Sequence, residues 1–481
     1  MGLTATRALT PKIVNYRFRA SSRVFSAISW ARREYVAFSE RFLKPLRILV
    51  VSYTFPPQAE VGSIRIAQFC RYLPECGIEP TVLSVEEQFY ESVDHSRTLP
   101  GSLRVLRTPR NSNPLEWYRS LKQIIKASPS RETHSKVSEG GETQGGYHWL
   151  RGNLNALLEV PDRYWGWYWP AVRRADQFFR QQRVDAVFSS GPPWTSHLVA
   201  RHLKRKFGVV WLADFRDPWA SAKSVRRRPA WWHQLASRLE KSCVQMADRV
   251  LCNTDRLREA YQLQYPDLDL AKFRTLTNGF EDLPVPRSDK INARRQFVHL
   301  GSLYGHRRID TFLIALNTLV RSGRLDPASF RVIFQGDMEP SHLAQAVKIA
   351  PDLLQCDCLE FLPRTSWQQA WNLLWQSDLL LLFQGSHELQ VPAKFYEYLQ
   401  TGIPMFAVAE EGALTDVLRA TAAGIWVGPA NPLDIADALL EALHLPHRSA
   451  EDVSRRLAGQ YHYRSLTKKL SLLIQEVVTG F

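Results

Sequence analysis

One stretch of the chain decides its fold class: LRILVVSYTFPPQAEVGSIRIAQFCRYLPECGIEPTVLSV, residues 46–85. It opens with an apolar run, LRILVVSY, that is typical of a buried strand. Apolar residues then recur on one helix face from Ile66 to Leu73, and Gly77 follows as a stop signal. A second apolar run, EPTVLSV, closes the segment. Strand, helix and strand in succession predict a βαβ unit and therefore a parallel sheet.

The same order of elements recurs along the chain. It returns in VDAVFSS, SHLVARHLKRKFG and VVWLADF, and again in DRVLCNT, DRLREAYQLQY and FRTLTNG. A further set of strands begins after residue 295, with FVHLGS, FRVIFQG, LEFLP, DLLLLF and IPMFAVA separated by helical patterns. We therefore expect an α/β protein with two doubly wound parallel-sheet halves.

Shifts in composition divide the chain into segments. Residues 1–44 form a basic extension, and residues 45–285 form the N-terminal half. Within that half, a polar and glycine-rich stretch at about 125–147 is expected to be a disordered surface loop. The C-terminal half covers residues 295–445, and the last patterned helix lies within residues 446–481.

The charge balance is basic. Lys plus Arg number 62 and Asp plus Glu 47, which gives a formal net charge of +15. A basic balance points to polyanionic partners: nucleic acid, anionic lipid or phosphorylated substrates.

No apolar run approaches the roughly 18 residues that a membrane-spanning helix needs. We therefore expect a cytoplasmic protein.

The cysteine pattern does not indicate a metal site. Six cysteines are scattered through apolar segments, and no two CxxC pairs have the spacing of a zinc site. We expect reduced thiols, as is usual in the cytosol. Cys356 and Cys358 suggest a redox or metal pair, but no neighbouring residues complete such a site.

The first 44 residues have three open interpretations. They carry nine basic and two acidic residues, interleaved with aromatic residues such as Phe18, Phe25 and Trp30. The segment fits a basic amphipathic stretch lying on an anionic membrane surface. It also fits a flexible or surface-packed extension, or a transit peptide, because residues 1–33 contain no acid.

Two candidate site residues lie where strands give way to helices, which is where ligands collect in open parallel sheets. Gly62 stands just before a helix N-terminus, where free amides favour a phosphate; the alternative is an ordinary strand–helix loop. His197 stands in the first turn after GPPWTS and faces either the crevice of the sheet or solvent; the alternative to a functional role is a purely structural one.

A third candidate is ADFRDPW, residues 213–219, at the end of an apolar strand. Alternation puts Asp214 and Arg216 on one side of the strand and Asp217 near the turn. Charges at the end of a buried strand cost free energy unless they are paired. The group is therefore either a structural network or a site for a polar ligand.

The fourth candidate is VPAKFYEYLQTGIPM, residues 391–405. Pro392 fits the first position of a short helix, and Gly402 fits its left-handed end. Lys394 and Glu397 share one face of that helix. Either they form an exposed ion pair, or Lys394 binds a phosphate and Glu397 binds the vicinal hydroxyls of a ribose.

Common catalytic motifs are missing from the sequence. The DxD pair of Asp267 and Asp269 is predicted to be a capping turn rather than a metal site. The chain contains no HExxH, no GxSxG and no P-loop sequence.

Taken together, seven collinear motifs resemble those of GT-B glycosyltransferases of the large retaining family 4, near bacterial members that build surface polysaccharides. They span residues from about 45 to 425 and read ILVVSYTFPPQAEVGSIR, PDRYWGW, DAVFSSGPPWTSHLVA, ADFRDPW, TNGF, GSLYGHR and VPAKFYEYLQTGIPM.

This resemblance implies two Rossmann-like domains that face each other across a cleft, with the last helix returning to the first domain. It implies a retaining, metal-independent transfer from a nucleotide-diphospho-sugar to a glycan or lipid-linked acceptor, with no further cofactor. The residues that would bind the nucleotide-sugar are Gly62, Arg307, Lys394 and Glu397. Those on the acceptor side would be Arg65 and Arg216, with His197, Asp214 and Asp217 as catalytic residues.

The chain departs from the family pattern at two places. In the N-terminal loop, Val61 precedes Gly62 where the family has a pair of glycines. Many relatives have a glutamate eight positions before the one matched by Glu397, whereas this chain has Leu389, preceded by Glu388. The alternative function is therefore a non-catalytic GT-B protein that binds a sugar nucleotide or a partner.

The hypothesis of a nucleic-acid binder rests on net charge alone, and we expect no specific nucleic-acid partner. An anionic membrane surface remains an expected partner of a peripheral enzyme on the inner face of the cell membrane.

Overall fold

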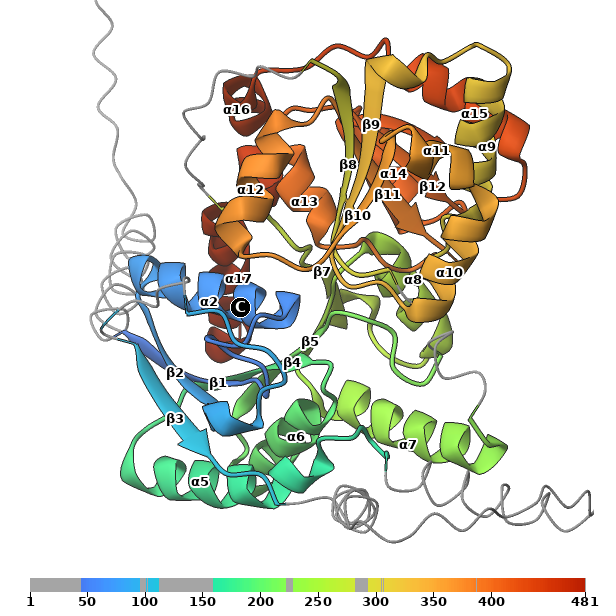
Figure 1. The fold of residues 1–481 in the computed structure, drawn as a ribbon. Helices are drawn as coiled ribbons and strands as arrows, with labels where there is room; N and C mark the ends of the chain where they lie inside the picture. The colour runs from blue at the N-terminus through green and yellow to red at the C-terminus, as the bar shows by residue number, and fades with distance from the viewer. Residues whose placement is uncertain are drawn as a thin grey trace, which may run out of the picture. The chain divides into compact units, whose positions relative to one another are not determined.

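The computed structural model describes residues 45–95, 101, 103–111, 159–221, 228–281, 293–303, 305, 307–385 and 387–480. The predicted basic extension (1–44) and the predicted disordered loop (about 125–147) lie outside these residues. Figure 1 shows two parallel sheets with helices on both faces of each.

The first sheet has seven strands in the order β3-β2-β1-β4-β5-β6-β7. The β2–β3, β1–β4, β4–β5, β5–β6 and β6–β7 pairings are parallel. Their bounds are β1 (Leu46–Val51), β2 (Ile78–Val85), β3 (Arg104–Thr108), β4 (Ala186–Gly191), β5 (Val210–Phe215), β6 (Arg249–Cys252) and β7 (Phe273–Thr275). The strand order reverses between β1 and β4, where Ile48 pairs with Ala186. Such a reversal opens a crevice at the carboxyl ends of the strands.

The second sheet has six parallel strands in the order β10-β9-β8-β11-β12-β13. Their bounds are β8 (Arg295–Leu300), β9 (Phe330–Gln335), β10 (Leu359–Leu362), β11 (Leu379–Gln384), β12 (Met405–Ala409) and β13 (Gly424–Val427). The reversal here falls between β8 and β11. The two parallel-sheet halves predicted from the sequence are thus confirmed.

The helices that accompany the first sheet are α2 (Val61–Tyr72), α5 (Tyr168–Gln181), α6 (Thr195–Phe207), α7 (Ala230–Met246) and α8 (Asp255–Gln264). Those of the second half are α9 (Asp310–Arg321), α10 (Pro340–Ile349), α11 (Pro351–Gln355), α12 (Trp367–Gln376), α13 (Lys394–Leu399), α14 (Ala413–Thr421) and α15 (Pro432–Ala442). The chain then continues through α16 (Ala450–Tyr461) and α17 (Tyr463–Thr479). Short 3-10 turns are η1 (Leu73–Cys76), η2 (Glu87–Phe89), η3 (Trp165–Trp167), η5 (Leu270–Lys272) and η6 (Pro327–Ser329).

The last helix, α17, packs against α2 on one face of the first sheet, whereas α5 and α6 cover the other face (Figure 1). The Phe69 and Tyr463 rings meet edge to face, with centroids 5.8 Å apart. Arg249 donates to Glu476 at 2.6 Å, which ties the end of α17 to β6. The C-terminal end of the chain therefore belongs structurally to the first half.

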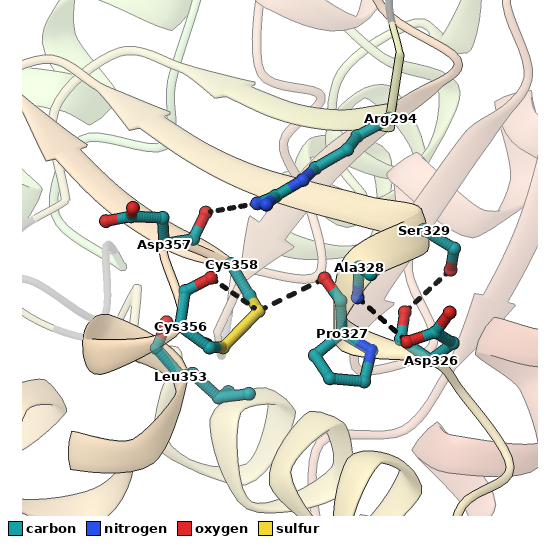
Figure 2. The surroundings of a disulfide bond; sticks show 9 residues. All are labelled: Arg294, Asp326, Pro327, Ala328, Ser329, Leu353, Cys356, Asp357 and Cys358. Atoms are coloured by element: carbon teal, nitrogen blue, oxygen red, sulfur yellow. Dashed lines mark hydrogen bonds between the residues drawn. A yellow bond between two sulfur atoms is a disulfide. The ribbon is translucent and has the colours of Figure 1, made fainter.

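Figure 2 shows a disulfide bond between Cys356 and Cys358. The expectation of six reduced thiols is therefore wrong for this pair. Asp357 lies between the two and has a left-handed backbone, with φ of 53°. This turn holds the two Cα atoms 5.4 Å apart, within bonding reach. The other four cysteines are free: Cys70, Cys76, Cys243 and Cys252.

Candidate functional site

A cleft of about 930 Å³ lies between the carboxyl ends of the two sheets. This volume is within the usual range of small-molecule sites. Its wall from the first half is built by Ala59, Glu60, Ile64, Ser92, Val93 and Asp94. Its wall from the second half comes from the ends of β8 and β9, the segment after β10, and α13; the charged side chains there are Arg307, Arg364, Lys394 and Glu397.

Helix α13 brings two of the predicted residues to this cleft. It begins at Lys394, two residues later than the proline start predicted from the sequence. Both Lys394 and Glu397 are half-buried and line the cleft. Tyr398, on the same helix, accepts a hydrogen bond from the backbone N–H of Leu300 at 2.8 Å. That bond fixes α13 against the end of β8.

Lys394 is held by a buried histidine that the sequence analysis did not single out. Its Nζ atom lies 3.0 Å from Nε2 of His299. The other ring nitrogen, Nδ1, lies 2.9 Å from the Leu381 carbonyl, to which it can only donate. Burial and the nearby charge of Lys394 both lower the pKa of His299 well below its usual range. The ring is therefore neutral, and its Nε2 atom accepts a hydrogen bond from Nζ of Lys394.

The environment of Lys394 disfavours its positive charge. Burial and, to a smaller extent, the charge of Arg307 lower its pKa, Glu397 partly opposes the change, and the net pKa is about 7. A pKa near 7 means that the ammonium group is only partly charged at neutral pH. An anion bound in the cleft would supply the missing counter-charge, so this lysine is suited to a phosphate.

Two glycines at strand ends make room for the lysine. Gly301 follows β8 with φ of 111°, and a Cβ there would lie 2.9 Å from Nζ of Lys394. Gly336 follows β9 with φ of 146°, and a Cβ there would lie 2.7 Å from the backbone of Gly301. Both positions need glycine because of the positive φ and the close approach.

The structure thus brings Arg307, Lys394 and Glu397 together on one wall, although 87 residues separate the first two in sequence. Arg307 is half-buried, and its charge acts on both Lys394 and Asp217. Their roles in binding a nucleotide-sugar stay predictions.

Gly62 is the fourth residue predicted to bind the nucleotide-sugar. It is buried behind the cleft wall, whereas its neighbours Glu60 and Ile64 line the cleft. A Cβ at Gly62 would overlap the guanidinium group of Arg216. Arg216 in turn donates to the carbonyl of Pro192. The glycine therefore allows the arginine to lie directly against α2.

Asp214 and Arg65 form a buried ion pair rather than part of the cleft wall. Both side chains are fully buried, with Nη2–Oδ1 and Nε–Oδ2 distances of 2.8 and 3.1 Å. Ser190 also donates to Asp214 at 2.7 Å. The remaining N–H groups of Arg65 donate to three acceptors: Leu276 O, Thr277 O and Asn278 Oδ1. This pair ties α2 to β5 and to the segment after β7; the predicted acceptor and catalytic roles are not tested.

His197 is likewise in the core. It is fully buried, and its Nδ1 atom lies 2.8 Å from Oγ of Ser189, which also accepts from Trp211 Nε1 at 2.8 Å. Its ring lies 4.4 Å from that of Phe215 between centroids. Burial lowers the pKa of His197 to about 3, so the ring is neutral. Its predicted catalytic role is untested, and the residue does not line the cleft.

Asp217 lies where the two halves meet. Its Oδ1 atom accepts a hydrogen bond of 2.6 Å from Nε2 of Gln390 in the second half. The neighbouring Leu389 carbonyl accepts from Thr254 Oγ1 at 2.7 Å, and the Leu389 side chain packs against the apolar core of the first half. Position 389, where the sequence departs from the family pattern, therefore forms part of the contact between the halves.

Sequence reasoning missed several residues that line the cleft, and also His299, which is buried behind Lys394. His299 was detectable as a polar residue within an otherwise apolar strand, FVHLGS. Glu60, Asp94 and Arg364 lie on loops and have no pattern that marks them before the chain folds.

Two features sought from the sequence have no counterpart among the residues described above. In that part of the chain, every helix is too short or too polar to cross a membrane. Nor do three or more His, Cys, Asp or Glu side chains gather there in a way that could hold a metal ion.

Comparison with known proteins agrees with this architecture. Residues 145–282 match the family described as Glycosyltransferase Family 4, and residues 286–458 match Glycosyl transferases group 1. A search of curated protein sequences gave no match.

Several solved structures share the fold. Sucrose-phosphate synthase from Thermosynechococcus elongatus aligns with a TM-score of 0.61 and 14% identity, covering 91% of this chain and 100% of that one. WaaG, a glycosyltransferase involved in lipopolysaccharide biosynthesis, gives 0.54 and 14%, with 91% and 100% covered. Anabaena HepE in complex with UDP and glucose gives 0.58 and 12%, with 90% and 100% covered. The chain therefore carries a Glycosyltransferase Family 4 domain followed by a Glycosyl transferases group 1 domain on a GT-B fold.

Proposed function

We propose that this protein is a retaining glycosyltransferase that moves a sugar from a nucleotide-diphospho-sugar to a polysaccharide or lipid-linked glycan acceptor. The observation that carries the proposal is the convergence of Arg307, Lys394 and Glu397 on one wall of a cleft between two parallel sheets. The family matches support glycosyl transfer as the reaction class.

The wall of the second half suits the donor. Lys394 and Arg307 supply positive charge where the leaving nucleoside diphosphate gains negative charge, and such charge stabilisation is a major source of catalysis. Glu397, one turn along α13 from Lys394, offers a carboxylate to the two vicinal hydroxyls of a ribose. With the diphosphate neutralised by side chains, the proposed transfer proceeds without a metal ion.

The wall of the first half suits the acceptor. Glu60 and Asp94 line it, and their carboxylates can accept hydrogen bonds from sugar hydroxyls. In the proposed step, an acceptor hydroxyl oxygen bonds to the anomeric carbon on the face that the diphosphate leaves. The bond from that carbon to the phosphate oxygen breaks, and the hydroxyl proton passes to the departing phosphate. The sugar then keeps its anomeric configuration without a nucleophile from the protein.

A non-catalytic binder of sugar nucleotides is the second candidate. The observation that favours it is Leu389, which packs against the first half. Release of free nucleoside diphosphate from a donor sugar distinguishes the two, because a binder leaves the donor intact.

We propose that the enzyme acts as a peripheral protein on the inner face of the cell membrane in surface polysaccharide biosynthesis. HepE was crystallised with UDP, and UDP-sugars are therefore the first donors to test.

A thermal-shift panel of UDP-, GDP-, dTDP- and ADP-sugars tests the donor. A specific ligand at 100 times its Kd should stabilise the protein by about 2.7 kcal/mol. If none of these nucleotide-sugars stabilises the protein, the proposed function is wrong.

A further inference from the structure

Three neighbouring helices of the first half carry a concentrated positive charge. Helices α5, α6 and α7 contain nine Lys and Arg residues and two acids, Asp176 and Glu240. By contrast, helices α9 to α15 of the second half contain four basic and seven acidic residues. The charge of the described chain is therefore unevenly distributed, with its excess on one helical layer.

The two acids of this layer are already engaged. Asp176 accepts from Lys206 and lies 3.1 Å from Nε2 of His202, both on α6. Glu240 is fully buried and accepts from the backbone of Ala220 and from the hydroxyl of Tyr265. Neither acid is placed to neutralise the outward-facing arginines.

The positive side chains point away from the sheet. On α5, the exposed residues Trp169, Arg173 and Arg180 are spaced so that they lie on one face of the helix. The Trp169 residue is 56% exposed. Arg205 on α6 and Arg238 and Lys241 on α7 are also exposed. None of these five basic residues has an ion-pair partner among the described residues. We call this surface the basic face, made of Trp169, Arg173, Arg180, Arg205, Arg238 and Lys241.

The three helices that carry the basic face are packed against one another. Helix α6 contacts both α5 and α7, and Figure 1 shows the three helices along the same side of the first half. Arg201 on α6 donates to Ser242 on α7 at 3.0 Å, which joins two members of the layer. The helices lie side by side in contact, and none stands clear of its neighbours as a helix that enters a DNA groove must.

We propose that the basic face docks on a membrane surface of anionic phospholipid. Clustered Lys and Arg residues bind such a surface electrostatically, and an exposed tryptophan is suited to the boundary between water and acyl chains. This docking surface belongs to the folded first half and does not depend on residues 1–44 or on the donor cleft. It would hold the enzyme at the leaflet that contains a lipid-linked acceptor.

Co-sedimentation of the full-length protein with lipid vesicles tests the proposal. The test variant reverses four charges on the basic face: Arg173→Glu, Arg180→Glu, Arg205→Glu and Arg238→Glu. The matched control makes the same change in net charge elsewhere, with Lys348→Glu, Arg456→Glu, Lys468→Glu and Lys469→Glu. All eight positions are exposed, and no ion pair is present at any of them among the described residues.

The wild type and the control should bind phosphatidylglycerol-containing vesicles alike, and the basic-face variant should bind roughly tenfold more weakly or worse. Trp169→Ala should weaken binding without changing its dependence on salt, since it removes no charge. None of the proteins should sediment with pure phosphatidylcholine vesicles.

Three results would overturn the proposal. Equal loss in the test and control variants would mean that only net charge matters. Unchanged binding of the test variant would place the docking surface elsewhere. If the test variant lost its binding to double-stranded DNA at physiological salt but kept its binding to vesicles, the basic face would be a nucleic-acid surface. Nucleotide binding by the same variants is a separate readout, so failure here leaves the proposed transferase function untouched.

Discussion

Lys394 Nζ lies 3.0 Å from Nε2 of His299, a neutral and fully buried imidazole whose other nitrogen is bonded to the Leu381 carbonyl. A lysine held by a neutral acceptor gains a hydrogen bond but no counter-charge. Together with burial, this arrangement leaves the pKa of Lys394 at about 7. The cleft therefore contains a cationic group whose charge is completed by an anionic ligand.

The first prediction is a pH dependence of nucleoside diphosphate affinity. Below pH 7, Lys394 is protonated before the ligand arrives, so affinity is at its full value. A bound diphosphate raises the pKa of the lysine. Above pH 7 each binding event must therefore take up a proton, and affinity should fall by up to about tenfold per pH unit. Calorimetric titration in buffers of different ionisation enthalpy would measure both the affinity and the proton uptake.

Lys394→Met is the control for this dependence, because it removes the lysine proton while the ionisation of the nucleotide remains. The variant should bind more weakly, and its affinity should no longer fall between pH 7 and 9. If wild type and variant had the same pH profile in this range, Lys394 would not contact the diphosphate.

The second prediction concerns Glu397, which lines the cleft beside Lys394. Glu397→Ala should keep the fold and weaken nucleotide binding by about 1.5–3 kcal/mol, as expected for the loss of a hydrogen bond to a charged group. A ribose contact also predicts that the wild type discriminates against 2′-deoxynucleotides and the variant does so less. Affinity equal to that of the wild type would leave Glu397 as a partner of Lys394 only.

The third prediction concerns Arg307 and metal dependence. Arg307→Ala should lower kcat by a larger factor than it raises the KM for the acceptor, because the charge on the leaving group grows in the transition state. Transfer should continue in the presence of EDTA. Complete loss of activity in EDTA, with recovery on adding Mg²⁺ or Mn²⁺, would contradict charge neutralisation by side chains alone.

The fourth prediction separates structural from chemical roles of the charged residues after β5. Asp214→Asn leaves Arg65 as a buried cation without its partner, and breaking such a pair costs about 3–5 kcal/mol. Denaturant unfolding should show this loss directly. Asp217→Asn, at a half-buried position that bonds Gln390 across the halves, should cost much less.

Activity of the folded fraction completes that comparison. If Asp214→Asn were as stable as the wild type yet inactive, Asp214 would be catalytic, as the family resemblance implies, rather than a structural partner of Arg65.

The sequence by itself determined the fold class. Apolar runs such as LRILVVSY and DLLLLF, separated by helices with one apolar face, can only bury their surfaces in parallel sheets covered by helices on both faces. It also predicted that Lys394 and Glu397 share one face of a short helix that follows a buried strand, whereas Arg307 came only from the family resemblance. Local pattern is enough for the fold class and for that helix face, since strand direction and helix face are set by neighbouring residues.

Tertiary structure alone decided which charged residues face the cleft. Asp214 and Arg65 stand at a strand end and a helix start like the others, yet they are buried against each other although they are 149 positions apart in the chain. A charge can be buried only if the fold delivers a partner with matching geometry. That partner comes from a distant segment, as Arg65 does for Asp214 and His299 for Lys394, so only the folded chain distinguishes a structural ion pair from a binding site.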